Sequence, residues 1–146
     1  MERYPYFTRF IVTKHKTAKE CHFDLRIARE NVGMSWAIEK FPKRTHDEVF
    51  INRTKNHSIC LFDDPSVIDG VTMVDSGKCD VYQWEDPIVV HLRGKIFKGF
   101  YSLRLFKFNR WVIRKESTKC MVEKFQIQYR GSIHDVDTKK HTVLQE

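Results

Sequence analysis

The chain has 146 residues, of which 41% are hydrophobic and 13% aromatic, and its formal net charge is +7. This length fits one domain with its own hydrophobic core, and the composition excludes an intrinsically disordered chain. Without an apolar run of roughly 18 residues or a leader-like segment, we expect a cytoplasmic protein with no membrane association. The four scattered cysteines form no CxxC pair, which argues against a zinc ribbon. The basic charge favours a polyanionic partner, nucleic acid first.

Most of the chain carries strand signals, in which apolar and polar residues alternate between short turns. The predicted strands, in chain order, are residues 9–13, 21–29, 34–39, 48–53, 58–62, 78–84, 88–92, 95–98, 100–107 and 110–115. Turns are expected at 30–33, 63–66, 76–77, 93–94 and 108–109, and a basic loop at 41–47. Turn signals at this spacing are typical of a barrel or a sandwich.

The character of the sequence changes after Glu116. Residues 124–130 alternate strictly and predict an edge strand, and residues 131–146 form a polar tail. We therefore predict a mostly β protein: a single compact antiparallel barrel with short helical turns, spanning residues 1–116, and a C-terminal extension over residues 117–146.

Residues 15–26 hold the densest group of chemically versatile side chains. The strict alternation from Cys21 onward predicts a strand that carries His22, Asp24 and Arg26 on one face, with successive members roughly 6.5–7 Å apart. His15 lies seven residues before His22, which is enough chain for a turn to bring the two histidines side by side. Two imidazoles and a carboxylate suit Mn²⁺, Fe²⁺ or Zn²⁺, and a nearby arginine suits a phosphate. Alternatively, these residues are the polar outer face of a sheet.

Six segments together resemble one known family. In this chain they read Lys14-His15, His22-Phe-Asp24-Leu-Arg26, Ser35-Trp-Ala-Ile-Glu-Lys40-Phe-Pro42, Asn56-His57, Lys95-Ile-Phe-Lys-Gly99 and Trp111-Val-Ile-Arg-Lys115. The series resembles the 3′-phosphoesterase domain of bacterial DNA ligase D and its free-standing archaeal relatives, over residues 7–116. That resemblance implies a β-barrel in which His15, His22 and Asp24 bind Mn²⁺, with Zn²⁺ a further ion for the same ligands.

The resemblance also implies roles on the phosphate. It assigns Arg26 and His57 to phosphate binding and catalysis, and Lys40 to the phosphate-binding pocket. The implied activity removes a 3′-phosphate or a 3′-terminal ribonucleotide to leave a 3′-hydroxyl in DNA repair. The implied partners are nucleic-acid 3′ ends, DNA or an RNA/DNA primer-template, together with a DNA ligase and polymerase of an end-joining system.

The chain departs from the family pattern at a tyrosine, which is replaced here by Leu61. Three functions therefore compete. One is a Mn²⁺-dependent 3′-phosphoesterase, which we favour. The second is a divergent, weakly active or inactive relative that binds nucleic-acid ends. The third is a β-barrel binding module whose histidines are structural.

Overall fold

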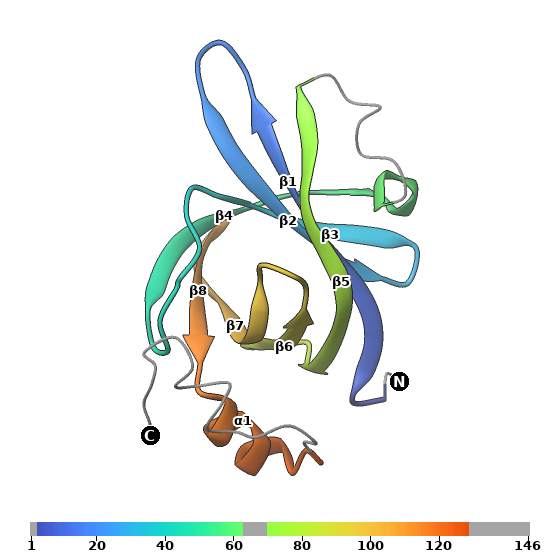
Figure 1. Ribbon diagram of the computed structural model, residues 1–146, viewed down its shortest axis with the longest axis vertical. Coiled ribbons are helices and arrows are strands. Elements are labelled where there is room, and N and C mark those ends of the chain that lie inside the picture. The colour runs from blue at the N-terminus through green and yellow to red at the C-terminus, as the bar shows by residue number, and fades with distance from the viewer. Residues whose placement is uncertain (1–2, 63–69, 129–146) are drawn as a thin grey trace.

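Eight antiparallel strands close into one barrel, with the order β1-β2-β3-β4-β8-β7-β6-β5 around it (Figure 1). The structure is a computed structural model that describes residues 3–62 and 70–128, without the side chains of Cys60 and Leu61. The strands are β1 (Tyr6–Lys16), β2 (Cys21–Arg29), β3 (Val32–Ile38), β4 (Glu48–Ser58), β5 (Val71–Gln83), β6 (Ile88–Arg93), β7 (Lys98–Lys107) and β8 (Arg110–Glu116). A 3₁₀ turn, η1 (Ile59–Phe62), follows β4, and a helix, α1 (Thr118–Phe125), follows β8. The predicted fold class is confirmed.

The barrel interior is filled by alternate side chains from every strand. In β2 the predicted bounds are confirmed, and Leu25 and Ile27 are fully buried in the core beside Trp36 of β3. Each such side chain contributes about 1.5–3 kcal/mol by leaving water. Because side chains alternate along a strand, Asp24 and Arg26 point to the outside of the barrel.

β4 is one continuous strand, where two strands on either side of residues 55–57 were predicted. An irregularity in the β3–β4 pairing, between Gly33 and Ser35, takes up the extra length, so no turn is needed. The Arg53 side chain stabilises this region by donating to the carbonyl oxygens of Ser35 and Thr54, at 3.0 and 2.6 Å. The predicted strand at 58–62 is wrong apart from Ser58, which ends β4, because the chain coils into η1 after it. The predicted turn at 63–66 lies outside the described residues.

β5 continues through Ser76 and Gly77, where a break was predicted. A Cβ on Gly77 would lie 2.4 Å from the carbonyl oxygen of Arg93, so this glycine permits close approach of the backbones and does not end the strand. The predicted strand at 95–98 is also wrong, apart from Lys98, which begins β7. The buried carboxylate of Asp75 accepts hydrogen bonds from three successive backbone N–H groups, of residues 95–97, and so holds a turn.

The predicted edge strand at 124–130 is wrong over its described part, because α1 extends to Phe125 and residues 126–128 are not in a strand. Ser117 caps the helix by accepting a hydrogen bond from the Cys120 N–H, and Gln126 ends it in the left-handed conformation. Met121 packs on Val89 and Phe100 of the barrel wall, a contact that the local alternation does not reveal. Within the described ranges, no helix is long and apolar enough to cross a bilayer.

Candidate metal centre

His15 and His22 lie directly opposite each other on β1 and β2, close to the hairpin that extends from one end of the barrel (Figure 1). Their ring centroids are 5.3 Å apart, and His22 Nε2 lies 3.4 Å from Asp24 Oδ1. One potential ligand atom from each of these three residues lies within 4.8 Å of the others. The imidazoles are half-buried and Asp24 is buried. The three residues predicted to bind a metal are therefore brought together on the outer face.

Glu20 orients the second imidazole, a role that the sequence analysis missed. Its Oε1 lies 3.1 Å from His22 Nδ1, so the other ring nitrogen is the one that faces Asp24. Thr17 shapes the connecting turn, since its Oγ1 accepts hydrogen bonds from the N–H groups of Lys19 and Glu20. A carboxylate behind a histidine is a common way to fix the tautomer of a metal ligand. The sequence signal for this role was the position of Glu20, two residues before His22.

Arg26 lies beside this cluster and is 3% exposed. Its Nη2 is 3.8 Å from Asp24 Oδ2, while Nε and Nη1 have no hydrogen-bond partner within the part of the chain that the structure describes. Burial lowers the pKa of the guanidinium, and the nearby charge of Asp24 opposes that shift. Buried donors are nearly always paired in proteins, so this guanidinium is suited to bind an anion from outside the fold.

Buried hydroxyl groups lie on the same face of the sheet as Arg26, and the sequence analysis missed these as well. Ser35 is in register with Arg26, Thr54 with Ser35, and Thr13 with Asp24. Their hydroxyl oxygens find no hydrogen-bond partner among the described residues. Directly opposed residues share a face of the sheet, so these hydroxyls line the same outer surface as the arginine. Sequence periodicity assigns faces within one strand but not the register between strands.

His57 faces the same surface from β4, in register with Gly33. Its Nδ1 is buried without a hydrogen-bond partner in residues 3–62 and 70–128. Burial, together with the positive charges of Arg26 and Lys55, lowers the pKa of the imidazole and so favours its neutral form. Phe62 of η1 packs close to Gly33, where a Cβ would lie 2.7 Å from its ring. The absence of a side chain at Gly33 thus lets η1 close over this part of the outer face.

Lys40 is placed differently from the other predicted site residues. It is exposed in the segment after β3 and lines a separate cavity of about 470 Å³. This cavity also contains Phe23, the ring pair of Phe41 and Phe97, and the buried amine of Lys115. The role of Lys40 on the phosphate stays a prediction.

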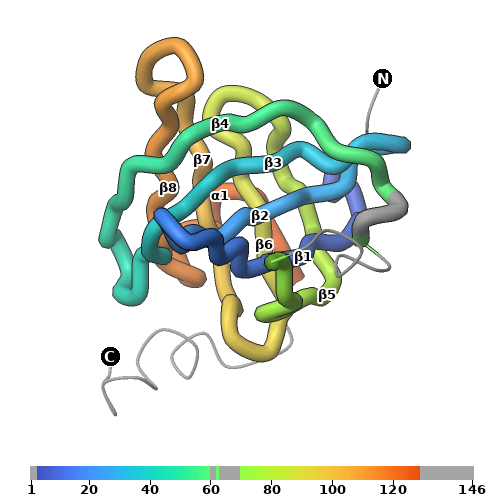
Figure 2. The backbone as a smooth tube through the Cα atoms, turned by 90° about the horizontal axis from the view of Figure 1, so that it is seen from above, coloured from blue at the N-terminus to red at the C-terminus, as the bar shows by residue number. Residues whose placement is uncertain are grey.

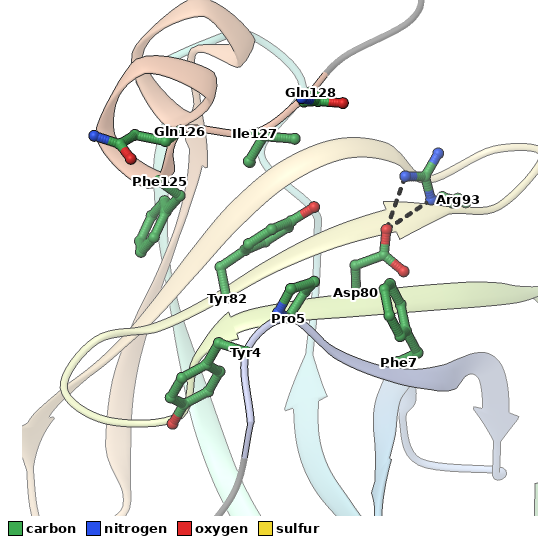
Figure 3. Close-up of a pocket in the computed structure, with 10 residues that line it drawn as sticks. All are labelled: Tyr4, Pro5, Phe7, Asp80, Tyr82, Arg93, Phe125, Gln126, Ile127 and Gln128. Atoms are coloured by element: carbon green, nitrogen blue, oxygen red, sulfur yellow. Dashed lines mark hydrogen bonds and ion pairs between the residues drawn. The ribbon is translucent and has the colours of Figure 1, made fainter.

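Another cavity, of about 580 Å³, shares no residue with the metal cluster (Figure 3). It lies between the N-terminal end of β1, strands β5 and β6, and the segment that ends α1. The carboxylate of Asp80 is already engaged there by Arg93, whose Nε and Nη2 donate to it at 3.0 and 2.8 Å. Tyr82 and Phe125 cover one side. This cavity offers aromatic surface and a satisfied ion pair.

Comparison with curated proteins supports the relation to bacterial DNA ligase D that the motifs suggest. The chain is 29% identical over 122 residues to the multifunctional non-homologous end joining protein LigD of Mycobacterium bovis. The same values hold for the multifunctional non-homologous end joining DNA repair protein LigD of Mycobacterium tuberculosis. The chain is similar to part of LigD. The match covers 73% of this chain and 16% of the length of each relative, so the chain spans about a sixth of these proteins. No protein-family model matches the chain.

Proposed function

We propose that this protein is a Mn²⁺-dependent phosphoesterase that processes nucleic-acid 3′ ends in DNA repair. Its products are strands that end in a 3′-hydroxyl, made by removing a 3′-phosphate or a 3′-terminal ribonucleotide. The observation that carries the proposal is the position of the Arg26 guanidinium beside the cluster of His15, His22 and Asp24. It is buried, and two of its nitrogens have no partner in the described part of the chain. The similarity to LigD supports an end-joining context.

The donor set suits a divalent cation. Two imidazoles and one carboxylate are ligands for Mn²⁺ and also for Zn²⁺, and three ligands leave positions for water and a phosphate oxygen. When bound, such a cation supplies Lewis acidity, which neutralises phosphate charge and lowers the pKa of a bound water. Glu20 holds the His22 ring so that Nε2 remains available to the cation.

The other residues act on the phosphate. Two donor nitrogens of Arg26, Nε and Nη1, have no partner among the described residues, and a guanidinium can bind two phosphate oxygens at once. The hydroxyls of Ser35 and Thr54 add neutral donors on the same side. The lowered pKa of His57 favours the neutral imidazole in the free protein, and this form can accept a hydrogen bond from the attacking water. To donate to the leaving 3′ oxygen it must first take up a proton, which the negative charge of a bound phosphate favours.

The second candidate function is binding of nucleic-acid ends with little or no turnover. Leu61, in place of the family tyrosine, favours it, because leucine offers no hydroxyl to the phosphate. The side chain of Leu61 lies outside the described residues. A structural role for the histidines is less well supported, since a purely structural cluster gives no reason to bury an arginine with unpaired donors.

The test is an assay of the purified protein with Mn²⁺ on a primer-template that carries a 3′-phosphate or a 3′-terminal ribonucleotide. We expect both ends to be converted to 3′-hydroxyls. Arg26→Gln and His57→Asn should each lower the rate by about a hundredfold or more, because each removes a contact to the reacting phosphate. The exposed Arg44→Gln serves as the matched control and should behave as the wild type. If the protein binds these ends and leaves them intact, the end-binding function replaces the enzyme.

A further inference from the structure

Three exposed phenylalanines gather on one part of the barrel wall. Phe50 of β4, Phe106 of β7 and Phe108 in the β7–β8 turn are 50%, 64% and 86% exposed. The rings of Phe50 and Phe106 contact each other edge to face, with centroids 5.5 Å apart. The β7–β8 hairpin, orange in Figure 2, stands clear of the barrel beside β4. Contiguous exposed aromatic surface of this kind marks an interaction site.

Cationic side chains lie over these rings. The guanidinium carbon of Arg110 is 4.8 Å from the centre of the Phe50 ring, and Lys107 Nζ is 5.8 Å from that of Phe108. Arg104 is exposed on β7, next to Leu105 and Phe106. We call the surface formed by Phe50, Phe106, Phe108, Lys107 and Arg110 the aromatic platform.

Nearby acidic groups are partly compensated. Glu116 accepts a hydrogen bond from Ser102 and lies 3.8 Å from the Nε of Arg114. Glu48 is in register with that same arginine. The cations of the hairpin, Arg104, Lys107 and Arg110, therefore dominate this surface, which favours a polyanionic ligand.

The strand register connects the platform to the metal cluster. Asp24 on β2 is in register with Ala37 on β3, which is in register with Asn52 on β4, and that residue with Arg110 on β8. This row crosses three inter-strand spacings, or roughly 14 Å along the outside of the barrel. Phe50 lies two residues from Asn52 and so faces the same side. A nucleic-acid strand of a few nucleotides can cover this distance.

We propose that the aromatic platform binds single-stranded nucleotides of the substrate next to the 3′ end held at the metal cluster. Bases stack on Phe106 and Phe108, and Arg110 and Lys107 contact the intervening phosphates. This inference rests on the proposed function, since it takes the strand's 3′ end to lie at Asp24 and Arg26. It requires no base-specific contact, because every base has a face that can stack on an aromatic ring.

The test measures binding of a fluorescently labelled single-stranded 12-nucleotide DNA to the full-length protein in EDTA, by anisotropy. Phe106→Ala should weaken binding about tenfold or more, because loss of one stacking ring has an effect of that order. Arg110→Gln should weaken binding and reduce the slope of log affinity against log salt by about one. Phe7→Ala is the matched control, because Phe7 is 74% exposed but lies on β1 at the cavity of Figure 3, and it should bind as the wild type.

Equal affinities for wild type, Phe106→Ala and Phe7→Ala would overturn the proposal. So would a dimer in sedimentation that Phe106→Ala dissociates while DNA affinity is unchanged, because the platform would then bind a second copy of the chain. DNA binding measured in EDTA does not require that the protein hydrolyse the strand. A failure here is therefore distinct from a failure to hydrolyse 3′ ends in the Mn²⁺ assay.

Discussion

Asp24 and Arg26 are charged side chains on the outside of a barrel, yet they are 7% and 3% exposed. Their closest contact is 3.8 Å, too long for a strong charge-assisted hydrogen bond, and two nitrogens of Arg26 stay unpaired among the described residues. Burying an incompletely paired charge is costly, and an arrangement of this kind usually reflects function. At the scale of single residues, this arrangement supports the proposal that the site binds a metal ion and a phosphate.

Removing the carboxylate of the cluster should abolish metal binding. We expect Asp24→Asn to lose measurable Mn²⁺ affinity in isothermal titration calorimetry, because two neutral imidazoles alone hold the ion weakly. Glu20→Gln should bind about tenfold more weakly, since it disturbs the orientation of His22. Glu39→Gln, an exposed control, should match the wild type. Unchanged affinity in a folded Asp24→Asn variant would refute the ligand assignment.

His91 should make the protein less stable in mild acid. It is buried and stacked on Phe100, with ring centroids 4.2 Å apart, and burial together with the charge of Arg93 lowers its pKa from 6.5 to about 4. The unfolded chain therefore binds a proton between these two values and the folded protein does not, so stability falls as the pH falls through this window. Between pH 7 and pH 5 the loss is about 2 kcal/mol.

Urea denaturation at the two pH values measures this loss. His91→Gln cannot take up the proton, so its free energy of unfolding should change less between pH 7 and pH 5 than that of the wild type. An equal change in both proteins would show that other groups cause the acid sensitivity.

At the scale of elements, β5 shows how a single strand serves two neighbours. It pairs with β1 on one side and with β6 on the other, and it is thirteen residues long. Gly77 lets the β6 backbone approach, and Asp75 two residues earlier anchors the turn between β6 and β7. The Ser76-Gly77 pair therefore belongs to a continuous strand whose neighbours lie unusually close.

Gly77→Ala should destabilise the barrel by about 1–3 kcal/mol. The added methyl group would lie 2.4 Å from the carbonyl oxygen of Arg93, and backbone can move away only by disturbing the sheet. Thermal denaturation followed by circular dichroism measures the effect. Ser76→Ala, at the exposed neighbouring position, should leave the midpoint nearly unchanged. A wild-type midpoint for Gly77→Ala would mean that β5 and β6 separate without cost.

At the scale of the whole molecule, the barrel closes through pairings between distant parts of the chain. β1 pairs with β5, and β4 pairs with β8, so each half of the sequence needs the other to complete the sheet. α1 then packs Met121 against Val89 and Phe100 on the outside. A closed sheet of this kind is expected to unfold cooperatively, in one two-state transition.

We expect a single unfolding transition, with coincident midpoints by far-ultraviolet circular dichroism and by tryptophan fluorescence. If α1 unfolds together with the barrel, Met121→Ala should lower the free energy of unfolding by about 2 kcal/mol or more. Both midpoints should then fall by the same amount. Met73→Ala, at a position that is 47% exposed, is the control and should have little effect. An early separate transition in the variant would show that α1 detaches independently.

The β class of this protein and the side chains of its candidate site could be predicted from local sequence patterns. Alternation within 21–29 was enough to place Leu25 and Ile27 in the core and His22, Asp24 and Arg26 on the other face, because the strand period is a local property. The family resemblance added His15 and His57, which the structure brings to the same surface.

The register between strands, and with it much of the candidate site, follows from contacts between distant parts of the chain. Ser35 and Thr54 share the outer face with Arg26 because β2, β3 and β4 pair in this register, and no local pattern contains that pairing. Likewise, a Ser-Gly pair is typical of a turn, but in this fold Gly77 lies in a strand whose neighbour is too close for a side chain. Residues 118–125 form a helix that packs Met121 against the barrel surface. Local periodicity fixes where a side chain points along one strand, whereas its neighbours depend on contacts between residues far apart in the chain.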